Sequence, residues 1–260
     1  MSQKIPVLVY HHVYPEGHLE LAVPPGDKAT GVIGEAEFRR HVQYIADGGW
    51  EVVPTTRLVS WLEGGSTLPQ RAVVLHFDNG WLDTSEIAMP ILSEFGMAGT
   101  CYVISEPTAA ASRGEPAGIR TSTEGVVYKP FLTWEHAREL LDTGWEIGAH
   151  TATHPKLGET LSQHGEKGVL AEIEGSNAEY KTGLGFAPVH FAYPSGSRSE
   201  RTDEILAQHY KSLRRWSFAN PSAWTFTDHE TSPFALECQN VDNTVSFEDF
   251  TRIFNEAEED

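Results

Sequence analysis

Short apolar runs alternate along the chain with longer segments whose apolar residues recur at helical spacing. Residues 72–77, Ala-Val-Val-Leu-His-Phe, predict a strand buried on both faces, because the run is rich in β-branched residues and does not alternate with polar ones. Residues 35–46 predict a helix that carries Phe38, Val42 and Ile45 on one face. Repeated strand and helix units predict an α/β protein with a parallel sheet, either open or closed into a barrel.

Two other segments lack a helical pattern. Residues 106–129 are rich in Ala, Gly, Ser and Thr without any period, which predicts a long loop of the kind that often carries function. Residues 234–237 predict a short last strand.

Thr133 and Ser246 each precede a helical pattern, so both are predicted to be helix N-caps.

Residues with catalytic or metal-binding chemistry follow three of the predicted strands. They are Asp78, Asn79, His150, His154, Tyr193 and Pro194. In parallel α/β folds the chemistry gathers at the carboxyl ends of the strands, so these groups are expected to lie close together.

His150 and His154 are four residues apart, and on a helical turn both rings would reach one metal ion. The spacing alone is a weak indication in a chain with twelve histidines. Asp78, Asn79 and Gly80 are likewise common turn residues. Together they are consistent with a hydrolytic site, in which an ion held by two histidines and an amide oxygen polarises a carbonyl and acidifies water. Asp78 would then be the general base, and a backbone N–H after the third strand would hold the oxyanion.

Bulk charge narrows the possible partners. The formal net charge of −18 disfavours nucleic acid and suits neutral or cationic partners. No run is long and apolar enough to predict a transmembrane segment, and the two cysteines are too few for a disulfide framework. The N-terminus enters a strand without a signal-peptide pattern, as expected of a cytoplasmic protein, or of an extracellular or periplasmic one whose leader has been removed.

Several spaced motifs resemble the polysaccharide deacetylases with a NodB-homology domain, which are carbohydrate esterase family 4. The motifs are residues 6–12 (Pro-Val-Leu-Val-Tyr-His-His), 77–80 (Phe-Asp-Asn-Gly), 132–134 (Leu-Thr-Trp), 148–155 (Gly-Ala-His-Thr-Ala-Thr-His-Pro) and 191–196 (Phe-Ala-Tyr-Pro-Ser-Gly). The first and last are most similar to the branch acting on poly-β-1,6-N-acetylglucosamine, and peptidoglycan deacetylases are similar too. The resemblance predicts one domain over residues 1–260 with a distorted (β/α)7 barrel. It implies metal-dependent removal of acetyl from N-acetylated sugars, usually with zinc and sometimes with cobalt or nickel.

The resemblance also implies residue roles. Asp78 takes the place of the catalytic base, His150 and His154 those of metal ligands, and Asn79 that of a third ligand that is normally Asp. Tyr193 takes the place that supplies a backbone N–H to the oxyanion. The residues predicted to contact the substrate are Tyr193, Pro194, Trp81 and His12. Trp134, Trp216 and Trp224 are further candidates for stacking on sugars, with core packing as the default for each.

Three positions depart from the family pattern. Asn79 removes a negative charge from the ligand set, so weaker metal binding is expected. Ala192 stands where many members carry an Arg that positions the base, and Arg214 or Arg215 is a candidate replacement, with a surface salt bridge as the alternative. The C-terminal strand with the acid histidine is not recognisable. His229 is the nearest candidate for the general acid, and the alternative is a histidine that is hydrogen-bonded or solvent-exposed without a catalytic role.

Two other functions stay open. The loop predicted at 106–129 would suit a deacylase or amidase for a small molecule if it closed the pocket. Asn79 and the unrecognised acid would also suit a non-catalytic carbohydrate-binding relative.

Overall fold

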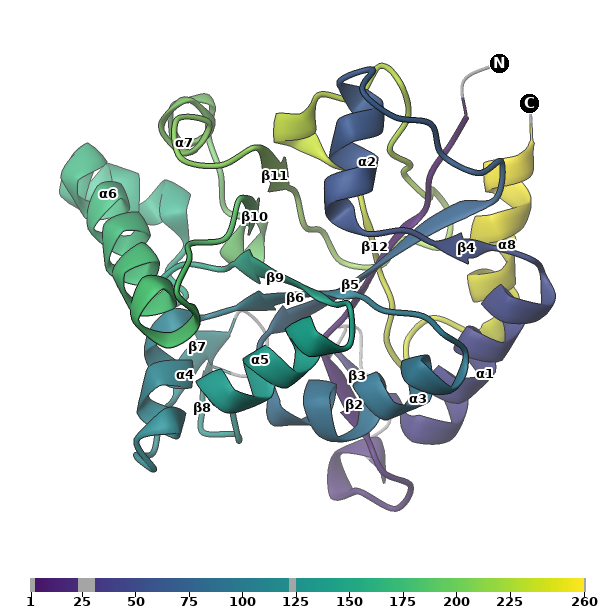
Figure 1. Cartoon of the computed structure of the whole chain (residues 1–260), viewed down its shortest axis with the longest axis horizontal. Coiled ribbons are helices and arrows are strands. Elements are labelled where there is room, and N and C mark those ends of the chain that lie inside the picture. Colours follow the sequence, from purple (N-terminus) through teal and green to yellow (C-terminus); the bar gives the residue numbers. More distant parts are fainter. Residues whose placement is uncertain (1–2, 23–30, 122–124, 260) are drawn as a thin grey trace.

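The computed structural model describes residues 3–22, 31–121 and 125–259, and one curled parallel sheet lies at its centre (Figure 1). The strand order is β11-β10-β9-β6-β5-β1-β12, with β4 paired to β5 off this path. The strands are β1 (Val7–Tyr10), β4 (Glu51–Val52), β5 (Ala72–Asn79), β6 (Thr100–Val103), β9 (Glu146–Ala149), β10 (His190–Ala192), β11 (Ser212–Arg214) and β12 (Gln239–Asn240). The predicted class, an α/β protein with a distorted barrel, is confirmed.

Helices cover the outside of the sheet, with α6 and α7 beside β10 and β11, and α1 near α8 (Figure 1). The helices are α1 (Glu35–Asp47), α2 (Thr55–Leu62), α3 (Met89–Glu94), α4 (Ser105–Ser112), α5 (Trp134–Asp142), α6 (Leu157–Leu184), α7 (Glu200–Leu206) and α8 (Phe247–Glu258). A π-helical segment, η2 (Thr84–Ala88), precedes α3, and short 3₁₀ segments are η1 (Leu19–Ala22), η3 (Pro194–Gly196) and η4 (Pro233–Ala235). No helix in the described ranges has both the length and the apolar character required to cross a bilayer.

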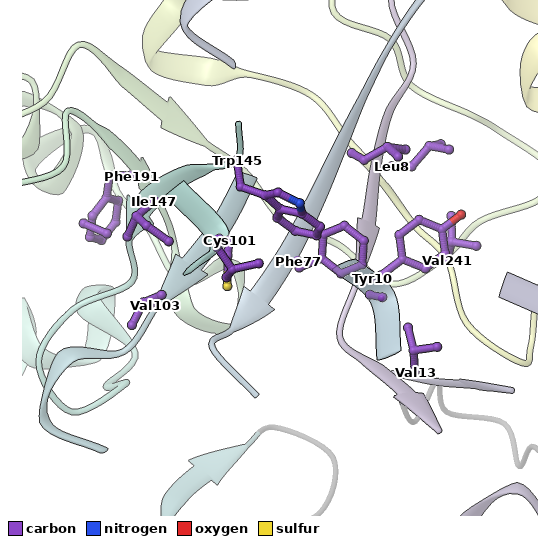
Figure 2. Close-up of a cluster of buried hydrophobic side chains, with 14 of the residues drawn as sticks. Leu8, Tyr10, Val13, Phe77, Cys101, Val103, Trp145, Ile147, Phe191 and Val241 are labelled. Carbon is purple, nitrogen blue, oxygen red and sulfur yellow. The ribbon is translucent and has the colours of Figure 1, made fainter. Parts of the chain in front are cut away.

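Strand β5 divides the interior, because successive side chains point to opposite faces. Val73, Leu75 and Phe77 point into the main core between the sheet and the helices. In Figure 2 the Phe77 ring lies between Tyr10 and Trp145, with ring centroids 5.5 Å and 4.9 Å away. Asp78 therefore faces the inside of the curled sheet, where the polar chemistry lies.

A short segment near the C-terminus joins the two ends of the sheet. The N–H of Leu236 donates to Leu213 O at 3.0 Å, and Leu236 forms a parallel bridge with Arg214 of β11. A few residues later, β12 pairs with β1 through Gln239 and Leu8. The strand predicted at 234–237 is therefore wrong in place, because η4 occupies the first half of that range and the strand follows at Gln239–Asn240.

The segment predicted as a long loop is also structured. It begins with α4 and continues into an antiparallel hairpin, β7 (Ile119–Thr121) with β8 (Gly125–Val127). A second small sheet pairs β2 (His12–Tyr14) with β3 (Val32–Gly34). The predicted N-caps are confirmed, since the hydroxyls of Thr133 and Ser246 accept the backbone N–H groups of His136 and Asp249.

Candidate active site

The predicted site residues come from neighbouring strands whose carboxyl ends meet at one edge of the sheet. The register pairs Asn79 with Val103, and Val103 with Ala149, so the residues after β5 and β9 lie side by side. Ala192 pairs in turn with Arg214, which brings β10 and β11 to the same edge.

A buried ion pair joins Asp78 and Arg214 across the inside of the sheet. One guanidinium nitrogen, Nη2, donates to both carboxylate oxygens at 2.6 Å, and the side chains are 2% and 0% exposed. Burial alone would raise the pKa of Asp78, but the charge of Arg214 outweighs it with help from His150 and His11, and the pKa falls to about 2. Of the two arginines considered, Arg214 is therefore the one that holds Asp78. Arg215 pairs with Glu237 instead.

His150 and His154 each use one ring nitrogen to bond a backbone carbonyl. Nδ1 of His150 lies 2.8 Å from Ala192 O, and Nδ1 of His154 lies 3.0 Å from Arg120 O. A carbonyl accepts only, so Nδ1 carries the proton and Nε2 keeps its lone pair. Burial, the largest cause, lowers the pKa values to about 3 and about 4, which keeps both rings neutral at pH 7.

The two rings converge without a helical turn. Their centroids are 5.0 Å apart, but residues 150–154 form no helix, and Thr151 and His154 both have a φ of 67°. The expected i, i+4 geometry on a helix is therefore wrong, although the rings still meet. The loop is fixed by the Thr151 hydroxyl, which accepts the N–H of His154 at 3.0 Å.

Asn79 ends β5 with a φ of 76°, a left-handed conformation that Asn tolerates better than most residues. Its Oδ1 is buried and accepts no hydrogen bond from the part of the chain that the structure describes. No three His, Cys, Asp or Glu side chains within the described ranges are grouped as a metal site. The donor set therefore fits a divalent ion only if the unpartnered Asn79 oxygen joins Nε2 of His150 and His154.

The residues after β1 have different roles. Nε2 of His11 lies 3.9 Å from Asp78 Oδ2, and its Nδ1 is buried without a hydrogen bond. His12 bonds Asp83 at 2.7 Å and stacks on Trp81 with centroids 4.5 Å apart. Trp81 is 1% exposed and also packs against Phe131. His12 and Trp81, predicted as substrate contacts, are therefore packed against each other in the wall of the site. Trp134 and Trp224 are buried in the main core as well.

The Tyr193 donors are both engaged. Its N–H donates to Arg214 O at 3.2 Å within the strand pairing, and its hydroxyl donates to Asp203 Oδ1 at 2.6 Å. This geometry does not support the predicted oxyanion role of the Tyr193 N–H, and both Tyr193 and Pro194 are buried. Two residues later, Ser195 has a φ of 53° and lines a cavity together with His154.

His229 lies at the other end of the sheet. Its ring packs on Trp61 with centroids 3.8 Å apart. The neighbouring Thr227 pairs with Ile5, which precedes β1, whereas the site follows the ends of the strands. The interpretation of His229 as a catalytic acid is therefore wrong.

Arg120 is a candidate site residue that the sequence did not reveal. Its carbonyl orients His154, yet it lies in a segment with no recognisable pattern, and a backbone contact leaves no signal in residue type. Ser195 was visible only as one of the turn residues after a strand.

A family model described as polysaccharide deacetylase matches residues 65–211. The chain therefore belongs to the polysaccharide deacetylase family, whose members are hydrolases acting on C–N bonds of carbohydrates, and the resemblance drawn from its motifs is confirmed.

Relatives with curated names agree with this assignment. One is YxkH of Bacillus subtilis (strain 168), named as a candidate polysaccharide deacetylase, with 23% identity over 76% of this chain and 59% of that protein. Another is the poly-β-1,6-N-acetyl-D-glucosamine N-deacetylase of Escherichia coli (strain K12), with 22% identity over 77% of this chain and 28% of that protein. The chain thus spans less than two thirds of either relative.

Solved structures share the fold. The Streptococcus pyogenes deacetylase PplD, in complex with acetate, superposes with a TM-score of 0.77 at 20% identity, over 97% of this chain and 98% of that one. IcaB from Ammonifex degensii gives a TM-score of 0.74 at 22% identity, over 99% and 98%.

Proposed function

We propose that the protein is a metal-dependent hydrolase that removes the acetyl group from an N-acetylated sugar of an oligosaccharide or polysaccharide. The observation that carries this proposal is a charged, buried Asp78 at the same sheet edge as two neutral imidazoles, those of His150 and His154, and as Asn79 Oδ1, which accepts no hydrogen bond from the described residues. The names of the relatives from E. coli and S. pyogenes support it.

The metal would be held by Asn79 Oδ1 and by Nε2 of His150 and His154, with zinc favoured and cobalt or nickel as alternatives. When bound, such an ion supplies Lewis-acid polarisation of the amide carbonyl and lowers the pKa of water. The carbonyls of Ala192 and Arg120 hold the imidazoles in the required tautomer.

Asp78 accepts the proton of the attacking water as the new C–O bond forms at the acetyl carbon. Arg214 keeps this carboxylate charged and fixes its orientation, replacing the arginine that many relatives carry at the position of Ala192. Since the pKa of Asp78 is about 2, the carboxylate is ionised at any pH near neutrality.

His11 would pass a proton to the leaving nitrogen, which its position 3.9 Å from Asp78 supports. As the C–N bond breaks, this nitrogen must gain one proton to leave as an amine, and the other product is acetic acid, which releases its proton to water and becomes acetate. Burial lowers the pKa of His11, although Asp78 opposes the effect, so the ring is neutral and relays a proton from Asp78. The oxyanion would be held by the N–H of Ser195, in the turn after β10.

The direct test is acetate release from N-acetylglucosamine oligomers after loading with zinc, cobalt or nickel. Asp78→Asn should reduce kcat by about 10²-fold or more, the usual scale for loss of a general base. The exposed Asp47→Asn on α1 removes the same charge elsewhere and should leave activity unchanged. Absence of acetate with every metal would contradict the proposal and favour a non-catalytic carbohydrate-binding role.

An extended substrate is favoured over a small molecule. The segment 106–129, predicted as a loop, forms most of α4 and the β7–β8 hairpin. The cavity that His154 lines has a volume of about 740 Å³. The residues that line this cavity run from His154 along α6 as far as Gly168 and Glu172, which leaves room for more than one scissile group.

A further inference from the structure

The cavity that His154 lines is also lined by residues of β7, of β8 and of α6. We call it the α6 groove. Its lining residues include Arg120, Lys156, Glu159, Thr160, Gln163 and Glu172. Almost all are polar, so the groove suits a ligand rich in hydroxyl and amide groups.

The carboxylates of the groove are already engaged. Glu172 accepts the N–H groups of Ala152 and Thr153 at 3.1 Å and 2.9 Å, and the hydroxyl of Thr153 at 2.8 Å. Glu159 accepts from Lys156 at 3.1 Å. These acids are therefore satisfied by the protein's own donors.

Arg120 is in the opposite situation. It is exposed, and its guanidinium forms no ion pair with any residue in the described ranges, while its carbonyl holds His154. A guanidinium presents five N–H donors in a plane, which suits ring hydroxyls and acetamido carbonyls. Arg120 therefore both lines the groove and bonds the proposed metal ligand His154.

The floor of the groove is shaped by a break in α6. Gly165 has φ 65° and ψ −168°, which is not helical, and the residues on both sides of it, His164 and Gly168, line the groove. The break divides α6 into two helical parts and gives the floor a bend that a straight helix would not have.

We propose that the α6 groove binds the sugar units next to the scissile sugar on one side, and that Arg120 is its principal hydrogen-bond donor. This inference rests on the proposed function, because it places the scissile unit at His154. It assigns the protein to oligomeric glycans and makes Arg120 a specificity-determining residue. Affinity should then grow with chain length until the groove is filled.

Binding can be measured without turnover. In an Asp78→Asn background, calorimetric titration with N-acetylglucosamine oligomers of one to five units should show affinity rising about tenfold or more from the monomer to the longer oligomers. Thr160→Trp, which fills the groove, should abolish that gain and spare the monomer. Ser162→Trp, exposed on the same helix outside the groove, is the matched control. Gln163→Trp is a second groove-filling variant if Thr160→Trp fails to fold.

Arg120→Ala should weaken binding of the longer oligomers about threefold to tenfold, with little effect on the monomer, since its carbonyl remains. Equal affinity for all lengths, or full length dependence in the groove-filling variants Thr160→Trp and Gln163→Trp, would overturn the inference. Because the readout is binding, it is separate from acetate release, and a protein that releases acetate without length dependence would refute only the groove.

Discussion

Asn79 shows how one residue satisfies two demands at the end of β5. The backbone needs a positive φ, which Asn and Asp adopt more readily than other non-glycine residues. The site needs an oxygen without a protein partner, and Asn79 Oδ1 is such an atom. Asp would meet the same backbone demand and add a negative charge, so the exchange isolates the effect of charge.

Asn79→Asp should therefore raise zinc affinity about tenfold or more without loss of folding, because a carboxylate is the stronger oxygen ligand. Competition with a chromogenic chelator measures this affinity. Asn79→Ala is the control and should weaken binding. Equal zinc affinity in all three proteins would show that residue 79 is not a ligand.

Arg214→Met should lower the free energy of unfolding by about 3–5 kcal/mol, because it leaves the Asp78 carboxylate buried without its partner. Urea denaturation measures the loss. Adding Asp78→Asn should recover part of it, since the unpaired charge is removed. If the double variant were as unstable as the sum of both single variants, the two side chains would not be coupled.

At the scale of elements, α6 combines a break at Gly165 with regular helix elsewhere. A backbone at φ 65° and ψ −168° is accessible almost only to glycine. Gly175, farther along the helix, is different, since a Cβ there would meet only the Ala152 Cβ at an ordinary 3.7 Å. The two glycines therefore make opposite predictions for the same substitution.

Gly165→Ala should destabilise the protein by about 1–3 kcal/mol through backbone strain. Gly175→Ala should stabilise it by about 0.5–1 kcal/mol, because alanine loses less conformational entropy in a helix. Thermal unfolding of the two variants provides the comparison. A harmless Gly165→Ala would mean that α6 can straighten, and the α6 groove should then change shape.

The sequence pattern predicted the elements that bury a continuous surface. The strand 72–77 was visible as an unbroken apolar run, because both of its faces are buried. The helix with Phe38 and Val42 was visible through its helical repeat, because one of its faces is buried. Helix α4 was not, since its alanine-rich sequence has no apolar stripe. The β7–β8 hairpin depends on pairing between two short strands, which a single-sequence pattern does not encode. For the site, side-chain chemistry indicated Asp78. Only the ion pair that Arg214 forms with Asp78 across the inside of the curled sheet distinguished Arg214 from Arg215.

At the scale of the whole molecule, buried neutral histidines make stability depend on pH. His41 lies in the core, stacked on Phe250 at 3.7 Å with Tyr10 OH 3.2 Å from its Nδ1. Burial, with a smaller effect from Arg40, lowers its pKa to about 3. In the unfolded chain His41 takes up a proton near pH 6.5, whereas in the folded protein it does so only near pH 3. The contribution of neutral His41 to stability is therefore fully present above pH 6.5 and decreases as the pH falls toward 3.

His41→Phe should flatten this dependence while keeping the stacked ring. Between pH 6.5 and 4 the free energy of unfolding should fall less steeply than in the parent protein, by up to about 1.4 kcal/mol per pH unit. At neutral pH the variant should lose about 1 kcal/mol with the Tyr10 hydrogen bond. Urea denaturation across this range gives both values, and parallel pH profiles would show that His41 is not responsible.

The short segment 236–240 bonds to β11 on one side and to β1 on the other. During synthesis, every residue of the proposed site leaves the ribosome before this segment does. Until then β11 lacks the bridge to Leu236, and Arg214 also lacks the Cys238 sulfur that lies 3.6 Å from its Nη1. A nascent chain therefore contains all of the proposed site residues for a time before the sheet is closed. Catalytic activity should then appear late, together with closure of the sheet, rather than gradually.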